Sequence, residues 1–143
     1  MDNVVYIEGN LLTTEAEVLV HQINSLSTKT PQGHGLAEAF KNLYPWSDRY
    51  GQRRSLNGRN LAIPEDQDKP GTIVVMRPPD GVVAPFIIGL VAQYEMSTPG
   101  RYKRGQALSD QDTKEKREEW FSTSLFYLSD FVRDKRIRSV AFP

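Results

Sequence analysis

Residues 17–23 (EVLVHQI) constrain the fold of this chain more than any other segment. The segment is short and largely apolar, and it contains several β-branched side chains, which is typical of a strand buried on both faces. Strands of this kind lie at the centre of α/β sheets, because helices cover both faces there. We therefore predict an α/β domain built around this strand.

The first half of the chain carries further elements around that strand. Residues 4–7 (VVYI) are predicted as a strand, which Gly9 and Asn10 end with a turn. Apolar residues at helical spacing predict a helix that begins near Gly35 and ends at Pro45. Residues 45–54 favour a further helical turn, and residues 55–71 are interpreted as a connection.

The second half adds a hairpin, a long helix and a last strand. Residues 72–76 and 86–92 are predicted strands, and the Pro-Pro-Asp-Gly link between them favours an antiparallel hairpin. Helical periodicity extends over residues 112–136, where Asp112 and Glu115 have the spacing of a capping box. Residues 139–142 are predicted as a final strand. The order β-β-α-β-β-α-β predicts a mixed sheet flanked by helices.

Composition excludes several classes of function. The chain has 143 residues, which favours one domain. Its 18 Lys and Arg residues balance 18 Asp and Glu residues, whereas general nucleic-acid and membrane-surface binders carry a basic excess. The absence of cysteine excludes disulfides, thiolate metal sites and a cysteine nucleophile. No motif predicts a metal site or a cofactor, and we expect a cytoplasmic protein, with the nucleus as an alternative location.

A glycine loop follows the central predicted strand. Asn24 lies at the carboxyl end of that strand, and Gly33-His34-Gly35 comes directly before the predicted helix. The carboxyl ends of strands form the usual ligand crevice of α/β sheets, and a helix N-terminus offers free N–H groups to an anion. Two interpretations therefore remain open from these residues, a phosphate-binding loop and a plain entrance to the helix.

Five segments, in this order along the chain, resemble the macro domain: residues 5–11 (VYIEGNL), 19–24 (LVHQIN), 33–37 (GHGLA), 86–94 (FIIGLVAQY) and 139–143 (SVAFP). The resemblance is to the branch that contains the ADP-ribose-1''-phosphate phosphatases in particular. It implies one macro-like domain over residues 1–143 that binds ADP-ribose, an ADP-ribose derivative or an ADP-ribosylated protein.

The same resemblance implies a set of ligand-binding residues: Gly9, Asn10, Leu11, Ile23, Asn24, Gly33, His34, Gly35 and Leu36. By the resemblance, the first three residues of this set lie at the adenosine end of the ligand. Asn24 meets the distal ribose, and the glycine loop cradles phosphate.

The resemblance also bears on catalysis, as removal of a phosphate or an ADP-ribosyl group. His21 matches the strand histidine attributed to the phosphatase branch, and a near-neutral pKa suits proton transfer. The other interpretation of His21 is a hydrogen-bonded core residue. Ala37 stands where some hydrolases of the family carry an aspartate, and Gln93 is the nearest match to the lysine of another branch.

The sequence departs from the family pattern at its end. Family members continue past the Ala-Phe-Pro strand into a second glycine-rich loop and a further strand, and here the sequence stops at Pro143. We interpret the chain as a C-terminally truncated form, as one whose missing part another chain supplies, or as one that dispenses with that part. The strand over residues 4–7 would then have an unpaired edge, which favours self-association.

A nucleic-acid-binding protein is the alternative function. It would use Arg53, Arg54 and the basic loop over residues 101–104 (RYKR). Phosphate contacts need a basic face, so the zero net charge weighs against this alternative.

Overall fold

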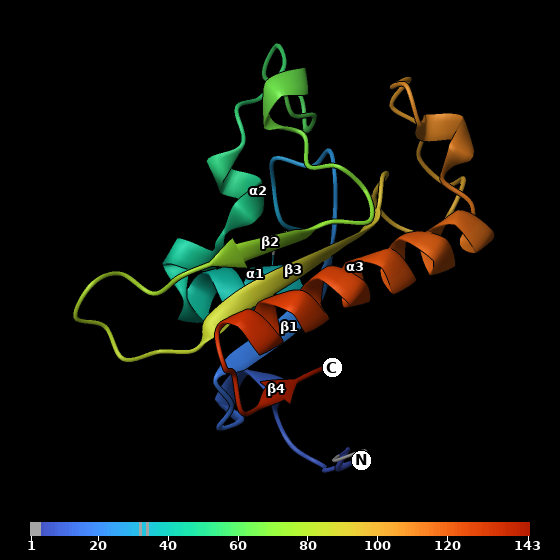
Figure 1. The fold of residues 1–143 in the computed structure, drawn as a ribbon. Coiled ribbons are helices and arrows are strands. Elements are labelled where there is room, and N and C mark those ends of the chain that lie inside the picture. Colours follow the sequence, from blue (N-terminus) through green and yellow to red (C-terminus); the bar gives the residue numbers. More distant parts are fainter. Residues whose placement is uncertain (1–3, 32, 34) are drawn as a thin grey trace.

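The computed structural model describes residues 4–31, 33 and 35–143. Its sheet has four strands in the order β2-β3-β1-β4 (Figure 1). The central strand β1 (Val18–Asn24) pairs in parallel with β3 (Phe86–Gln93) on one side and with β4 (Val140–Ala141) on the other. The edge strand β2 (Ile73–Met76) pairs with β3 in the antiparallel sense. The mixed sheet and the central place of residues 17–23 are confirmed.

Helices cover both faces of the sheet (Figure 1). The long helix α3 (Lys114–Asp134) packs on one face, and α1 (Leu36–Leu43) packs on the other, followed by the single turn α2 (Arg49–Gln52). Short 3₁₀ turns complete the structure, at Leu11–Thr13, Pro45–Ser47, Pro64–Asp66 and Ser109–Gln111. Among the described residues, no helix is long and apolar enough to cross a membrane.

The alternation of side chains along β1 divides the core between the two faces. Val18 and Val20 are fully buried in a cluster with Leu128 of α3. Leu19, on the opposite face, packs in a second cluster with Phe40 of α1. Because both faces are covered, β1 is apolar at successive positions rather than at alternate ones. The position of β1 fixes the place of the residues that follow its carboxyl end.

The structure corrects the expectation of a first strand over residues 4–7. These residues form no strand, and their apolar side chains are exposed, from 68% for Ile7 to 94% for Tyr6. A strand is stabilised by backbone hydrogen bonds to a neighbour, and within the described part of the chain these residues have no paired strand. The β-branched pattern alone is therefore not enough to form the element.

The start of α3 also differs from the expected capping box. Thr113 is the N-cap, and its side chain accepts a hydrogen bond from the backbone N–H of Lys116 at 3.1 Å. Asp112 lies outside the helix and is buried, where its carboxylate accepts hydrogen bonds from Arg117 and from the backbone N–H of Glu95. The carboxylate of Asp112, which the sequence pattern assigned to the helix cap, is thus used by the ion pair with Arg117 and the hydrogen bond from Glu95.

Candidate functional site

A cavity of about 360 Å³ lies at the carboxyl ends of β1 and β3. We call it the main cavity. It is lined by residues of the β1–α1 loop, the start of α1 and the end of β3, together with two side chains from the intervening segments: Gln22, Asn24, Ser27, Lys29, Thr30, Pro31, Gly35, Leu36, Ala37, Tyr50, Asn60, Gln93, Met96 and Ser97. Its volume lies in the range of ~300–1,000 Å³ that is common for ligand sites. Its position matches the crevice in which α/β sheets bind ligands.

The described lining of the main cavity includes amide and hydroxyl side chains and a cation, Lys29, but no carboxylate. At its edge, Gly35 is the N-cap of α1 with a φ of 89°, and no side chain caps the helix. L side chains rarely adopt such a φ, so glycine is the residue that fits this entrance to the helix. The uncapped N–H groups of α1 and the ammonium of Lys29 both favour an anionic ligand.

Asn24 shapes the loop that forms one wall of this cavity. Its side-chain Oδ1 accepts hydrogen bonds from the backbone N–H of Leu26 at 3.1 Å and of Ser27 at 2.8 Å. Its Nδ2 donates to the hydroxyl of Tyr50 at 3.2 Å. The residue is buried. Asn24 therefore closes the turn after β1 and still lines the cavity.

Two arginines, the buried Arg53 and the partly buried Arg104, hold the same loop from behind. Arg53 donates to the backbone carbonyls of Ser27 at 2.8 Å and Asn24 at 2.7 Å, and to the carboxylate of Asp68 at 2.7 Å. Arg104 donates to Glu95 at 2.7 Å and approaches the hydroxyl of Ser27 at 3.4 Å. These contacts satisfy carbonyls that the loop would otherwise leave unpaired.

Asp68 joins Arg53 to the start of α2. Arg49 pairs with both carboxylate oxygens of Asp68, at 2.7 and 2.8 Å. Burial acts to raise the pKa of Asp68, but the hydrogen bonds from Arg49 and Arg53 outweigh it and hold the pKa below its ordinary value. Burial also lowers the pKa of Arg53, against the opposing effect of Asp68. The site thus rests on a buried network of ion pairs.

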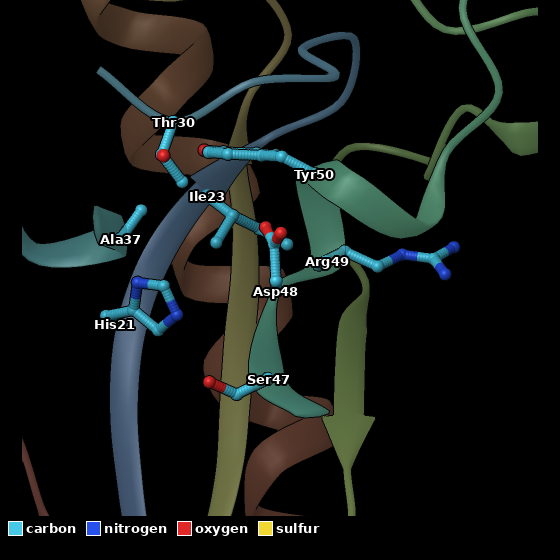
Figure 2. Close-up of a pocket in the computed structure, with 8 residues that line it drawn as sticks. All are labelled: His21, Ile23, Thr30, Ala37, Ser47, Asp48, Arg49 and Tyr50. Carbon is cyan, nitrogen blue, oxygen red and sulfur yellow. The ribbon is translucent and has the colours of Figure 1, made fainter. Parts of the chain in front are cut away.

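A second, much smaller cavity of about 10 Å³ lies beside the main one (Figure 2). It is lined by side chains from β1, the β1–α1 loop, α1 and the α2 region: His21, Ile23, Thr30, Ala37, Ser47, Asp48, Arg49 and Tyr50. Thr30, Ala37 and Tyr50 line both cavities, so the two cavities adjoin. The volume is close to what one water molecule needs.

His21 lines the small cavity and not the main one. It is 4% exposed, and its ring lies 4.6 Å from that of Phe40, centroid to centroid. Burial lowers its pKa to about 4, so the ring is neutral at pH 7. Neither ring nitrogen has a hydrogen-bond partner among the described residues.

The structure brings together only part of the residue set named from the sequence. Asn24, Gly35 and Leu36 line the main cavity, and His21 and Ile23 line the small one. The remaining residues were expected from the sequence resemblance, and none of those described lines either cavity: Gly9, Asn10, Leu11 and Gly33. Asn10 instead caps the turn Leu11–Thr13 by accepting from the backbone N–H of Leu12 at 3.0 Å. The expected role of His34 lies outside the described residues.

Sequence reasoning missed Lys29, Tyr50 and Asn60 as site residues. Lys29 lies between Asn24 and the Gly33-His34-Gly35 pattern, in a stretch of the loop that gave no motif of its own. Tyr50 has the pattern of a core aromatic, and Asn60 lies in a segment without periodicity. The side-chain amide of Asn60 accepts from the backbone N–H groups of Thr28 and Lys29, at 2.8 and 3.2 Å. Only the folded chain shows that these residues border one cavity.

The basic residues of the nucleic-acid alternative do not form one exposed surface. The side chain of Arg53 is fully buried, and Arg104 pairs with the buried Glu95. Arg54 pairs with Asp66, and Lys103 pairs with Asp110. Nothing in this arrangement supports nucleic-acid binding. In the described part of the chain, no cluster of three or more histidine, aspartate or glutamate side chains could hold a metal ion.

Comparisons with known proteins agree on the fold. No protein-family model matches the sequence, and no curated protein matches it. The macrodomain of Mycobacterium tuberculosis DarG is similar in structure, with a TM-score of 0.61 and 20% identity over 96% of this chain and 73% of that one. The macrodomain of Thermus aquaticus DarG has a TM-score of 0.62 and 23% identity over the same shares of the two chains. The chain has a macrodomain fold.

Proposed function

We propose that this macrodomain-fold chain binds ADP-ribose, or the ADP-ribosyl group of a modified protein, in the main cavity. The observation that carries the proposal is the cavity itself, which lies at the carboxyl ends of the central parallel strands of a macrodomain fold and is lined by Lys29 without a carboxylate. The lack of a carboxylate matters because the diphosphate of ADP-ribose carries negative charge.

Three groups of the cavity fit two parts of this ligand, the diphosphate and a ribose. The start of α1 at Gly35 offers free N–H groups to a phosphate, and Lys29 adds a positive charge nearby. In this proposal Asn24 meets a ribose, and one N–H of its amide that is not used within the turn supports this role. In this proposal, phosphate contacts supply much of the affinity and the hydrogen bonds orient the sugar.

Calorimetric titration tests the proposal. We expect wild-type protein to bind ADP-ribose, and we expect single-stranded RNA to give no signal at either of two salt concentrations. Lys29→Ala should weaken ADP-ribose binding by up to about 1 kcal/mol, the size expected for an exposed charge. Lys135→Ala, at the C-cap of α3, removes an equal charge away from the cavity and serves as the matched control. A wild-type protein that ignores ADP-ribose contradicts the proposal.

A further inference from the structure

Tyr50 lies between the two cavities and lines both of them. The residue is 7% exposed, and Figure 2 shows its ring crossing the pocket with the hydroxyl end directed toward the side of Thr30. The side chain comes from α2, which lies far along the sequence from the β1–α1 loop. Its hydroxyl is therefore a polar group brought into the site by the tertiary fold alone.

The hydrogen bonds of the Tyr50 hydroxyl determine where its proton points. The oxygen accepts from the backbone N–H of Asn24 at 3.0 Å and from the Nδ2 of Asn24 at 3.2 Å. A phenolic hydroxyl has a donor and a limited capacity to accept, which two N–H groups occupy. No described residue accepts the hydroxyl proton. Both N–H groups of Asn24 face the hydroxyl oxygen of Tyr50. We therefore expect the hydroxyl proton to point away from Asn24, where a ligand in the main cavity can accept it.

The side-chain amide of Asn24, like the hydroxyl of Tyr50, leaves a hydrogen-bond donor for a ligand. The Oδ1 of Asn24 accepts two backbone N–H groups, and one hydrogen of its Nδ2 is given to Tyr50. What remains of both side chains for a ligand is therefore a donor, an O–H from Tyr50 and an N–H from Asn24. A ligand oxygen satisfies these donors, whereas a ligand N–H at the same place would leave them facing another donor.

We propose that Tyr50 is a specificity-determining residue of the main cavity, whose hydroxyl donates a hydrogen bond to an acceptor oxygen of the ligand. This inference rests on the proposed function, since ADP-ribose offers hydroxyl and phosphate oxygens as acceptors. In this proposal Tyr50 has two roles. Its oxygen accepts hydrogen bonds from Asn24 and holds that residue in place, and its O–H donates a hydrogen bond to the ligand. The two roles can be separated by experiment, because one uses the hydroxyl as an acceptor and the other uses it as a donor.

The first experiment is calorimetric titration of ADP-ribose into wild type and Tyr50→Phe. Loss of a donated hydrogen bond should weaken binding about tenfold. Tyr44→Phe is the matched control, because the Tyr44 hydroxyl donates to the carbonyl of Leu12 at 3.1 Å, outside both cavities. That control should bind ADP-ribose like wild type. Thermal melting of each variant measures its stability beside its affinity.

The second experiment replaces Tyr50 with 3-fluorotyrosine, below neutral pH where both phenols keep their proton. Fluorine makes the phenol a stronger donor and a weaker acceptor. Tighter ADP-ribose binding by this protein, with weaker binding by Tyr50→Phe, supports the inference. Weaker binding by both proteins shows that the hydroxyl only holds Asn24 and overturns it, as does unchanged affinity in a folded Tyr50→Phe.

The result on wild type keeps this inference distinct from the proposed function. If wild-type protein does not bind ADP-ribose, the proposed function fails and the inference fails with it. If wild type binds and the Tyr50 proteins behave like wild type, the inference fails alone. The fluorinated protein keeps the test decisive even if Tyr50→Phe does not fold, because it retains every heavy atom of the tyrosine.

Discussion

At the scale of the residue, Asn24 serves the turn and the proposed recognition with different atoms. Asn24→Ala removes the oxygen that accepts from Leu26 and Ser27, so we expect the free energy of unfolding to fall by about 2 kcal/mol. Asn24→Asp keeps that oxygen but replaces the N–H donor with a charged acceptor, to which the Tyr50 hydroxyl can donate, so its stability should lie closer to wild type than that of Asn24→Ala. Both should weaken ADP-ribose binding, as urea unfolding and calorimetry will show. Full affinity in Asn24→Asp contradicts a recognition role.

The burial of His21 leads to a second prediction at this scale, on how the free energy of unfolding depends on pH. Its pKa is about 4 in the folded protein, against about 6.5 in an unfolded chain, so the unfolded state takes up a proton first as pH falls. The full contribution to stability is present above pH ~6.5 and is lost between ~6.5 and ~4, a change of roughly 3 kcal/mol.

Urea unfolding over that pH range checks this prediction with two variants. His21→Leu should flatten the profile between pH ~6.5 and ~4, since it removes the group that is buried in its neutral form. His34→Gln replaces the other histidine of the chain and shows whether that residue contributes to the slope. A slope that survives in His21→Leu assigns the pH dependence to other groups.

At the scale of the element, the sequence predicted what local pattern determines. The strand β1, the helix α1 and the hairpin of β2 and β3 were found because burial, helical spacing and turn residues all lie within each segment. The strand over residues 4–7 was wrong because a strand depends on a partner elsewhere. Asn24 and Gly35 were found by their place after a strand and before a helix. Tyr50 could not be found, since only tertiary packing places it beside Asn24.

The connection after α2 gives a prediction about ion pairs. Asp68→Asn removes the carboxylate that neutralises the buried Arg53, and such a loss costs about 3 kcal/mol of unfolding free energy. Asp66→Asn is the matched control, because Asp66 pairs with Arg54, whose side chain is 70% exposed, and little change is expected. Thermal unfolding compares the two. Equal effects contradict the importance of the buried pair.

At the scale of the whole molecule, the sheet ends at two edge strands, β2 and β4, and within the described residues the short β4 has no partner on its outer side. β4 pairs with β1 only at Val18 and Leu19. The apolar side chains of residues 4–7, which precede the first strand in the sequence, are exposed. Unpaired edges and exposed β-branched segments favour association. We therefore propose that the 143-residue chain self-associates through the exposed residues 4–7 and the edge of the sheet at β4.

Light scattering over a range of concentrations tests this proposal. Val5→Lys should shift the protein toward the monomer, because a charge on the exposed segment opposes pairing. Val83→Lys, on the fully exposed link between β2 and β3, places the same charge elsewhere and should leave the association as in wild type. A wild-type protein that is monomeric at every concentration overturns the proposal.

The parallel pairing of β1 with both of its neighbours also governs how fast the chain can fold. Neither neighbour is close in sequence, and at the base of β1 the backbone N–H of Glu17 bonds to the hydroxyl of Ser139 across 122 residues. Contacts of such long range slow folding, because the entropy of closing large loops is lost before the contacts form. During synthesis on the ribosome, the central strand β1 therefore emerges before either of its parallel partners. The interval between the synthesis of β1 and that of β3 is the time when this protein is most exposed to aggregation.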